Sequence, residues 1–142
     1  MGDRCYLTLR FRKADSKAFT KEFMYSPEEW AEEVHLDENG IMEVSITEAN
    51  YALYREFQNL AEAKIPFIVT HTAGDAYGPG EMVSDGEGNF SGVVVGHEGG
   101  GYVAAIKLNR ETEVLELDER DLDDLRAHLK ILDRVEKMLG VL

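Results

Sequence analysis

The sequence predicts an α+β fold with a mainly antiparallel sheet of five to seven strands and two longer helices packed on one face. Ten of the 13 glycines lie between Pro66 and Leu108, where they separate short runs of β-prone residues. Strands separated by glycine turns are typical of a sheet. These runs follow one another without intervening helices, which argues against a parallel, doubly wound fold. Two stretches, 48–64 and 119–139, have the apolar spacing of amphipathic helices.

Length and composition indicate a single domain over residues 1–142. The chain is 44% apolar and 30% charged, which is enough apolar material for a core. No run approaches the ~20 apolar residues that a membrane span needs. A lone Cys5 excludes an internal disulfide. Together with a first stretch that has no signal-peptide pattern, it leads us to expect a cytoplasmic protein.

The first 25 residues predict an antiparallel hairpin. Residues 4–12 alternate as a half-buried strand does, with one face formed by Cys5, Leu7, Leu9 and Phe11. After a turn at 13–17, a second strand is expected over 18–25, with Phe19, Phe23 and Tyr25 on one face. The outward basic groups of this hairpin account for the one positive region of the chain.

Two helices are predicted between residues 26 and 66. Ser26, Pro27 and Glu29 form a capping-box pattern, which begins a short helix anchored by Trp30 and Val34 and ended by 37–40. A strand is expected over 41–46. Thr47 then caps a helix over 48–64, which Ile65–Pro66 ends. Its expected buried face consists of Tyr51, Tyr54, Phe57, Leu60 and Ala61.

The glycine-rich stretch predicts strands at 67–72, 81–84, 93–95 and 102–108, and a last strand follows at 114–117. Turns are expected at 85–89, 97–100 and 109–112. The loop over 73–80 is longer than a tight turn needs, and it carries an aromatic residue, Tyr77.

The closing helix is predicted over 119–139, with Asp118 as its cap and Gly140 as its stop. Its apolar stripe is broader than the two-residue seam of a coiled coil, so we expect it to pack on the sheet. A homodimer through this C-terminal helix is the alternative.

The net charge of −13 is unevenly distributed. Residues 26–62 hold ten acidic side chains and one basic one, Arg55. The chain lacks the clustered lysines and arginines that bind phosphates, so we expect no direct nucleic-acid binding. The same field repels anionic membranes and favours a basic protein partner. An acidic surface that serves only solubility is the simpler explanation.

Known motifs are absent from the sequence. The turns at 37–40 and 85–89 fail the residue order of a calcium-binding EF-hand loop, and Gly99–Gly101 lies between strands without a nearby basic residue. No Gly-x-Ser-x-Gly motif is present, and neither Ser84 nor Ser91 has a partnered histidine nearby in the sequence, so no nucleophile triad is indicated. We predict no metal site and no cofactor. The candidate binding residues, from two glycine-rich loops, are His71, Asp75, Tyr77, His97, Glu98 and Tyr102.

Three functions remain open, and the sequence favours a protein that is not an enzyme. The first is an acidic binding protein that neutralises or regulates a more basic macromolecule, as an immunity protein or a phage inhibitor does. The second is a small-ligand binder that uses loops 73–80 and 96–102, with Tyr77 and Tyr102 as stacking groups. The third is a small hydrolase or lyase that uses the histidines and carboxylates of those loops, namely His71, Asp75, His97 and Glu98.

Overall fold

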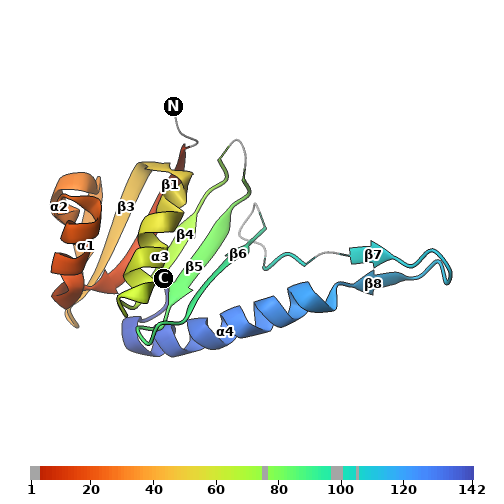
Figure 1. Cartoon of the computed structure of the whole chain (residues 1–142). Coiled ribbons are helices and arrows are strands. Elements are labelled where there is room, and N and C mark those ends of the chain that lie inside the picture. Colours follow the sequence, from red (N-terminus) through yellow and green to blue (C-terminus); the bar gives the residue numbers. More distant parts are fainter. Residues whose placement is uncertain (1–3, 75–76, 97–100, 105) are drawn as a thin grey trace.

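A computed structural model of the chain describes residues 4–74, 77–96, 101–104 and 106–142 and shows an α+β protein (Figure 1). Its centre is a six-stranded antiparallel sheet with the strand order β2-β3-β1-β4-β5-β6. The strands are β1 (Arg4–Arg12), β2 (Glu33–Leu36), β3 (Ile41–Asn50), β4 (Phe67–His71), β5 (Gly80–Ser84) and β6 (Phe90–Val94). A separate two-stranded sheet consists of β7 (Ile106–Leu108) and β8 (Leu115–Leu117). The predicted fold class and the mainly antiparallel sheet are confirmed.

Helices cover both faces of the six-stranded sheet. They are α1 (Ser16–Phe23), α2 (Pro27–Trp30), α3 (Tyr54–Glu62) and α4 (Glu119–Leu139), with single turns η1 (Lys13–Asp15) and η2 (Tyr51–Leu53). Helices α1 and α3 bury Phe19 and Phe57 in the larger core, which also holds Phe67 and Val69 of β4. On the other face, the C-terminal half of α4 packs on Ile68 and Val83 through the buried side chains of Ile131, Val135 and Leu139.

The two longer helices therefore lie on opposite faces, and the expectation that they share one face is wrong. The reason lies in β4, where Phe67, Ile68 and Val69 are all buried. Successive side chains of a strand point to opposite faces, so a continuous apolar run needs cover on both sides. Arg10 of β1 also fixes the end of α4, because its Nε donates a 2.6 Å hydrogen bond to the carbonyl oxygen of Leu139.

The predicted strand over 18–25 is also wrong, because residues 16–23 form α1. Phe19 and Phe23 are four residues apart, a spacing that suits one face of a helix as well as one face of a strand. In the helix, the ring centroid of Phe19 lies 4.2 Å from that of Phe11, and Phe23 lies 5.1 Å from Trp30. There is no N-terminal hairpin, and β1 pairs instead with β3 and β4.

The capping box at Ser26 is confirmed, although the helix that it begins is short. Glu29 Oε2 accepts a 2.9 Å hydrogen bond from the backbone N–H of Ser26. Helix α2 ends at Trp30, and residues 33–36 form the edge strand β2 instead of a second helical turn. Val34 consequently pairs with Val44 of β3 and is 41% exposed, so it does not anchor the helix with Trp30.

The helix expected over 48–64 begins later than predicted. Strand β3 continues to Asn50, and α3 begins only at Tyr54, so Thr47 is a strand residue and not a cap. Phe57, Leu60 and Ala61 are buried as predicted, whereas Tyr51 and Tyr54 are exposed. Between strand and helix, η2 is a left-handed turn in which Tyr51, Ala52 and Leu53 have φ values of 50°, 53° and 55°.

Helix α4 has the predicted limits. Asp118 Oδ1 accepts a 2.9 Å hydrogen bond from the backbone N–H of Arg120, and Gly140 follows the last turn with a φ of 81°. The helix continues beyond the edge of the six-stranded sheet toward β7 and β8 (Figure 1). Within the described part of the chain, no helix is long and apolar enough to cross a membrane.

Candidate functional site

The structure separates the predicted binding residues. His71 ends β4 and its ring lies against that of Tyr77, with the ring centroids 5.7 Å apart. Tyr102 lies on the α4 side of the sheet, where its hydroxyl donates a 2.9 Å hydrogen bond to Glu81 Oε1. Asp75, His97 and Glu98 lie outside the described residues. His71 and Tyr77 therefore belong to one site, and Tyr102 belongs to another.

His71 and Tyr77 line a cleft of about 360 Å³ on the α3 side of the sheet. Its walls come from η2 and α3, from the end of β4 and from the segment that leads into β5; its floor is formed by β5 and β6. The lining residues are Tyr51, Ala52, Tyr54, His71, Tyr77, Gly78, Pro79, Gly80, Glu81, Met82, Gly92, Val93 and Val94. Of these residues, His71 and Tyr77 were predicted from the sequence as binding residues, whereas Tyr51 and Tyr54 were predicted to be buried.

Two glycines on the floor let aromatic rings lie directly over the sheet. A Cβ atom at Gly80 would lie only 2.5 Å from His71 Nε2, and one at Gly92 would lie 3.3 Å from Cε2 of Tyr54. Glycine inside a strand often marks a place where another group approaches the backbone closely. The two glycines therefore allow the rings of His71 and Tyr54 to lie close to the sheet at the cleft.

The polar character of the cleft comes largely from His71. Its Nδ1 lies 2.9 Å from the carbonyl oxygen of Thr72, so in the neutral ring Nδ1 carries the proton and donates it there. Nε2 is then a hydrogen-bond acceptor above the floor at Gly80. Glu81 lines the cleft, but its carboxylate is hydrogen-bonded to His128 on the opposite face of the sheet. No ionised carboxylate of a lining residue therefore points into the cleft.

The left-handed turn η2 forms part of the cleft wall. A left-handed conformation costs a non-glycine residue about 1–2 kcal/mol, and η2 contains three in succession. Ala52 is buried at 3% exposure, so packing holds the turn in place. Backbone strain of this kind is concentrated at functional sites. The sequence carries no signal for it, because none of the three residues is glycine or asparagine.

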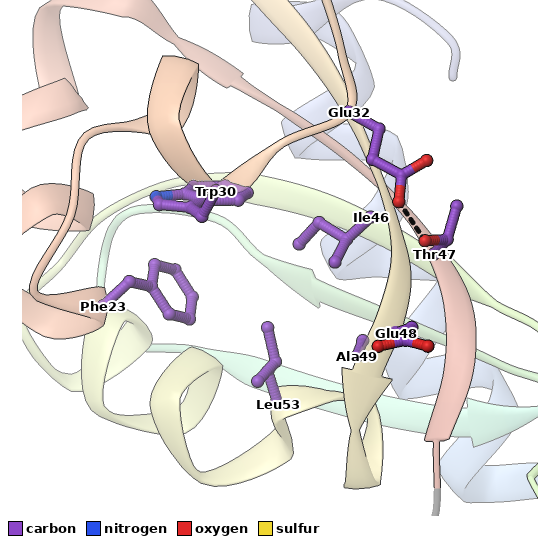
Figure 2. A pocket seen from close by; sticks show the side chains of 8 residues that line it. All are labelled: Phe23, Trp30, Glu32, Ile46, Thr47, Glu48, Ala49 and Leu53. Carbon is purple, nitrogen blue, oxygen red and sulfur yellow. Dashed lines mark hydrogen bonds between the residues drawn. The ribbon is translucent and has the colours of Figure 1, made fainter.

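A second cavity, of about 400 Å³, lies on the same side of the sheet between α2 and β3 (Figure 2). Phe23, Trp30, Ile46 and Leu53 line its apolar part, and Figure 2 shows Glu32 and Glu48 beside Thr47 at the β3 side. The hydroxyl of Thr47 donates a hydrogen bond to Glu32. Leu53 belongs to η2, so the left-handed turn contributes to both cavities.

Ser91, His128 and Glu81 form a buried polar cluster that the sequence did not reveal. His128 is fully buried, with Nε2 at 2.7 Å from Glu81 Oε1 and Nδ1 at 2.8 Å from Ser91 Oγ. These are the residue types of a nucleophile triad, but none of the four cavities described for this chain is lined by Ser91 or His128. Burial and the hydrogen bond to Glu81 raise the pKa of Tyr102, so it remains a donor. The cluster joins α4 to β5 and β6.

The β7–β8 hairpin, which we call the arm, projects beyond the six-stranded sheet at the start of α4 (Figure 1). The strands at 102–108 and 114–117 were expected in the main sheet; instead 106–108 and 115–117 form the arm, and Tyr102 makes one bridge with Val95. In the arm, Ile106 pairs with Leu117 and Leu108 with Leu115. These four side chains share one face and are 56–68% exposed. The arm thus has an uncovered aliphatic face.

Metal binding receives no support from the described residues, among which no three His, Cys, Asp or Glu side chains form a group that could hold an ion. Comparisons with family models, with curated proteins and with solved structures find no match for this chain.

Proposed function

We propose that this chain is a non-enzymatic acidic binding protein whose arm docks on a more basic protein and neutralises or regulates it. The observation that carries the proposal is the aliphatic face of the arm, formed by Ile106, Leu108, Leu115 and Leu117, which no other part of the described chain buries.

An exposed aliphatic face of this kind is costly unless a partner covers it. A single two-stranded hairpin is marginally stable in water, and moving a Leu or Ile side chain out of water contributes roughly 1.5–3 kcal/mol. The arm obtains no such contribution from the part of its own chain that the structure describes. An apolar centre with a polar rim is also the usual composition of a protein–protein interface.

Charge argues for a basic partner in preference to a second copy. Residues 106–127, which form the arm and the projecting turns of α4, hold eight acidic and four basic side chains. A second copy would itself carry a net charge of −13, so two copies would repel each other. A basic protein would instead be attracted toward the arm, and its association would be faster at low salt.

The proposal is tested by replacing aliphatic side chains of the arm with charged ones. A photo-crosslinking residue at position 108 should capture the partner in an extract of the native host, and the same residue at position 141 is the control. With the purified partner, Leu108→Glu/Leu117→Glu should weaken binding at least about 30-fold in calorimetry, because two anchors are lost and two charges are buried. Val141→Glu, at a site that is 75% exposed at the far end of α4, should leave binding unchanged.

Two results would overturn the proposal. In the first, light scattering shows that the wild-type chain is a dimer and that the Leu108→Glu/Leu117→Glu variant is a monomer. The arm would then pair with a second copy. The second result is a partner that is acidic or that crosslinks equally well from position 141. Both variants should keep the wild-type unfolding midpoint, since the substituted side chains are exposed.

A further inference from the structure

We infer that the cleft between α3 and strands β4–β6 binds a small, uncharged, planar aromatic molecule that donates a hydrogen bond to Nε2 of His71. This site lies in the six-stranded body and is separate from the arm, so the inference does not rest on the proposed function.

The walls of the cleft favour an aromatic ligand. Tyr51 and Tyr54 remain 57% and 49% exposed although they border an apolar hollow, and Tyr77 lines the same cleft. The ring of Tyr54 is fixed from behind by Phe90, edge to face with the centroids 5.5 Å apart. Rings that are held in place and left partly uncovered can stack on a planar ligand or meet its edge.

The floor of the cleft gives the ligand its space. Gly80 and Gly92 lie in neighbouring strands on the same face, where a Cβ atom would press on the ring of His71 or Tyr54 and shift the walls of the cleft. The resulting volume of about 360 Å³ lies within the range of small-molecule sites. Glycine weakens a strand interior, and its presence at both positions is explained by the close approach of the rings that form the cleft walls.

The polar groups of the cleft determine the hydrogen-bonding group and the charge of the ligand. The hydrogen bond from Nδ1 to Thr72 fixes the tautomer of His71 and leaves Nε2 as an acceptor, which calls for an N–H or O–H donor on the ligand. No ionised carboxylate of a lining residue points into the cleft, because that of Glu81 is engaged by His128 on the other face. Among the described lining residues, a charged ligand would find no counter-ion to replace its lost hydration, so we infer an uncharged ligand.

The left-handed turn supplies an independent observation at the same place. Tyr51 and Ala52 line the cleft with φ values of 50° and 53°, and this unfavourable backbone is what brings Tyr51 to the cleft beside Tyr54. A right-handed continuation of α3 would be the favourable alternative for these residues. Retention of the strained form at the wall of a cavity supports a binding role for that wall.

The test uses 2-naphthol, a planar, uncharged donor with its own fluorescence, and 2-methoxynaphthalene, which has the same ring system without a donor. Fluorescence anisotropy should show saturable binding of 2-naphthol with one site per chain. The methoxy compound should bind about fivefold more weakly, the factor expected for one hydrogen bond. His71→Leu should reduce 2-naphthol binding to the methoxy level and leave the methoxy compound within twofold.

Matched variants separate the cleft from the rest of the surface. Tyr54→Ala should weaken both probes about fivefold by removing one wall. Tyr25→Ala, which removes a tyrosine that is 63% exposed away from the cleft, should change neither. Gly92→Ala, which places a methyl group on the floor, should also weaken the binding of both probes. The test therefore does not depend on a single variant.

The last measurement locates the bound probe on the protein. In amide NMR spectra, 2-naphthol should shift Gly78, Gly80 and Gly92, and it should leave Thr47 and Ala49 of the second cavity unchanged. Three results would each overturn the inference. The first is a set of shifts confined to the second cavity, and the second is equal affinity of the wild-type chain for the two probes. The third is an unchanged affinity of both probes in His71→Leu and Tyr54→Ala.

Discussion

The β5–β6 and β7–β8 hairpins are built alike but differ in what surrounds them. Each turn begins with a side-chain oxygen that accepts two backbone N–H groups: Asp85 from Glu87 and Asn89, and Asn109 from Glu111 and Thr112. In the first hairpin, helices lie on both faces and Met82, Val83 and Ser84 are buried. In the second, all six strand residues are exposed.

The difference shows that apolar residues in a strand predict that a face is covered but not what covers it. In β5, the adjacent residues Met82 and Val83 lie on opposite faces, and α3 and α4 of the same chain cover them. In the arm, the apolar residues alternate and share one face, which has no cover within the described residues, and this is why we propose a partner there. Three substitution pairs test how far the two hairpins really differ.

The largest difference is expected in the apolar side chains. Met82→Ala in β5 should lower the free energy of unfolding by about 3 kcal/mol, because a buried side chain is lost and a cavity remains. Leu115→Ala in β8 should lower it by no more than about 0.5 kcal/mol, because Leu115 is 68% exposed. Urea unfolding measures both. Similar losses for the two variants would mean that the arm is covered in the isolated protein.

The contributions of the two turns to the free energy of unfolding should differ in their dependence on pH. Burial raises the pKa of Asp85, but hydrogen bonds from Asn89 and the backbone of Glu87, together with Arg134, outweigh it, so the pKa is lowered overall. A lowered carboxyl pKa stabilises the fold above the unfolded value near 4, and this contribution is lost as the pH falls through the folded value. Asp85→Asn should therefore cost about 2 kcal/mol at pH 7 and progressively less below about pH 4.

Asn109→Ala is the matched change in the arm. Its effect should be small and independent of pH, since Asn109 carries no ionisable group and its turn is exposed. Urea unfolding of both variants between pH 3 and pH 7 makes the comparison. An Asp85→Asn cost that stays constant over that range would contradict a lowered pKa of Asp85 in the folded protein.

The smallest difference concerns backbone conformation. The β5–β6 turn uses Gly86 and Gly88 at its positive φ values of 80° and 94°, whereas the arm places Glu113 at 56°. Glu113→Gly should relieve about 1 kcal/mol of strain. Hydrogen exchange of the Asn109 amide, which is bonded to the carbonyl of Val114, should then slow about fivefold.

Lys64→Gly, at a φ of 63° after α3, is the control for that measurement. It should raise the urea midpoint of the body without changing exchange in the arm. A change in arm exchange with Lys64→Gly would show that the arm and the body unfold together.

The parts of the fold that could be predicted are those with a local signal. The capping residues at Ser26 and Asp118 and the stop at Gly140 all act within one helical turn, and all were identified. The spacing of Phe19 and Phe23 suits a strand and a helix equally well, so the local pattern was insufficient there. The helical spacing of Tyr51, Tyr54 and Phe57 continues across a strand end and a left-handed turn, and side-chain types give no indication of a positive φ.

The candidate site was predictable only where its residues are neighbours in the chain. His71 and Tyr77, which lie close together in the chain, were both candidates, but Tyr77 was paired with Tyr102 as a stacking group and His71 belonged to a catalytic set. Tyr51 and Tyr54 reach the cleft through the packing of α3, and the glycine floor depends on the pairing of Met82 with Gly92. The cluster of Ser91, His128 and Glu81 joins residues as many as 47 positions apart, so no sequence spacing could reveal it.

The position of the arm has a practical consequence for hydrodynamic measurements. Helix α4 contains 21 residues, which corresponds to about 31 Å, and the arm extends the molecule further in the same direction (Figure 1). Such an elongated particle diffuses more slowly than a sphere of equal mass. A single copy of this chain should therefore elute early from a size-exclusion column and resemble a larger assembly there. Scattering intensity, which depends on mass and not on shape for a particle of this size, distinguishes one copy from two.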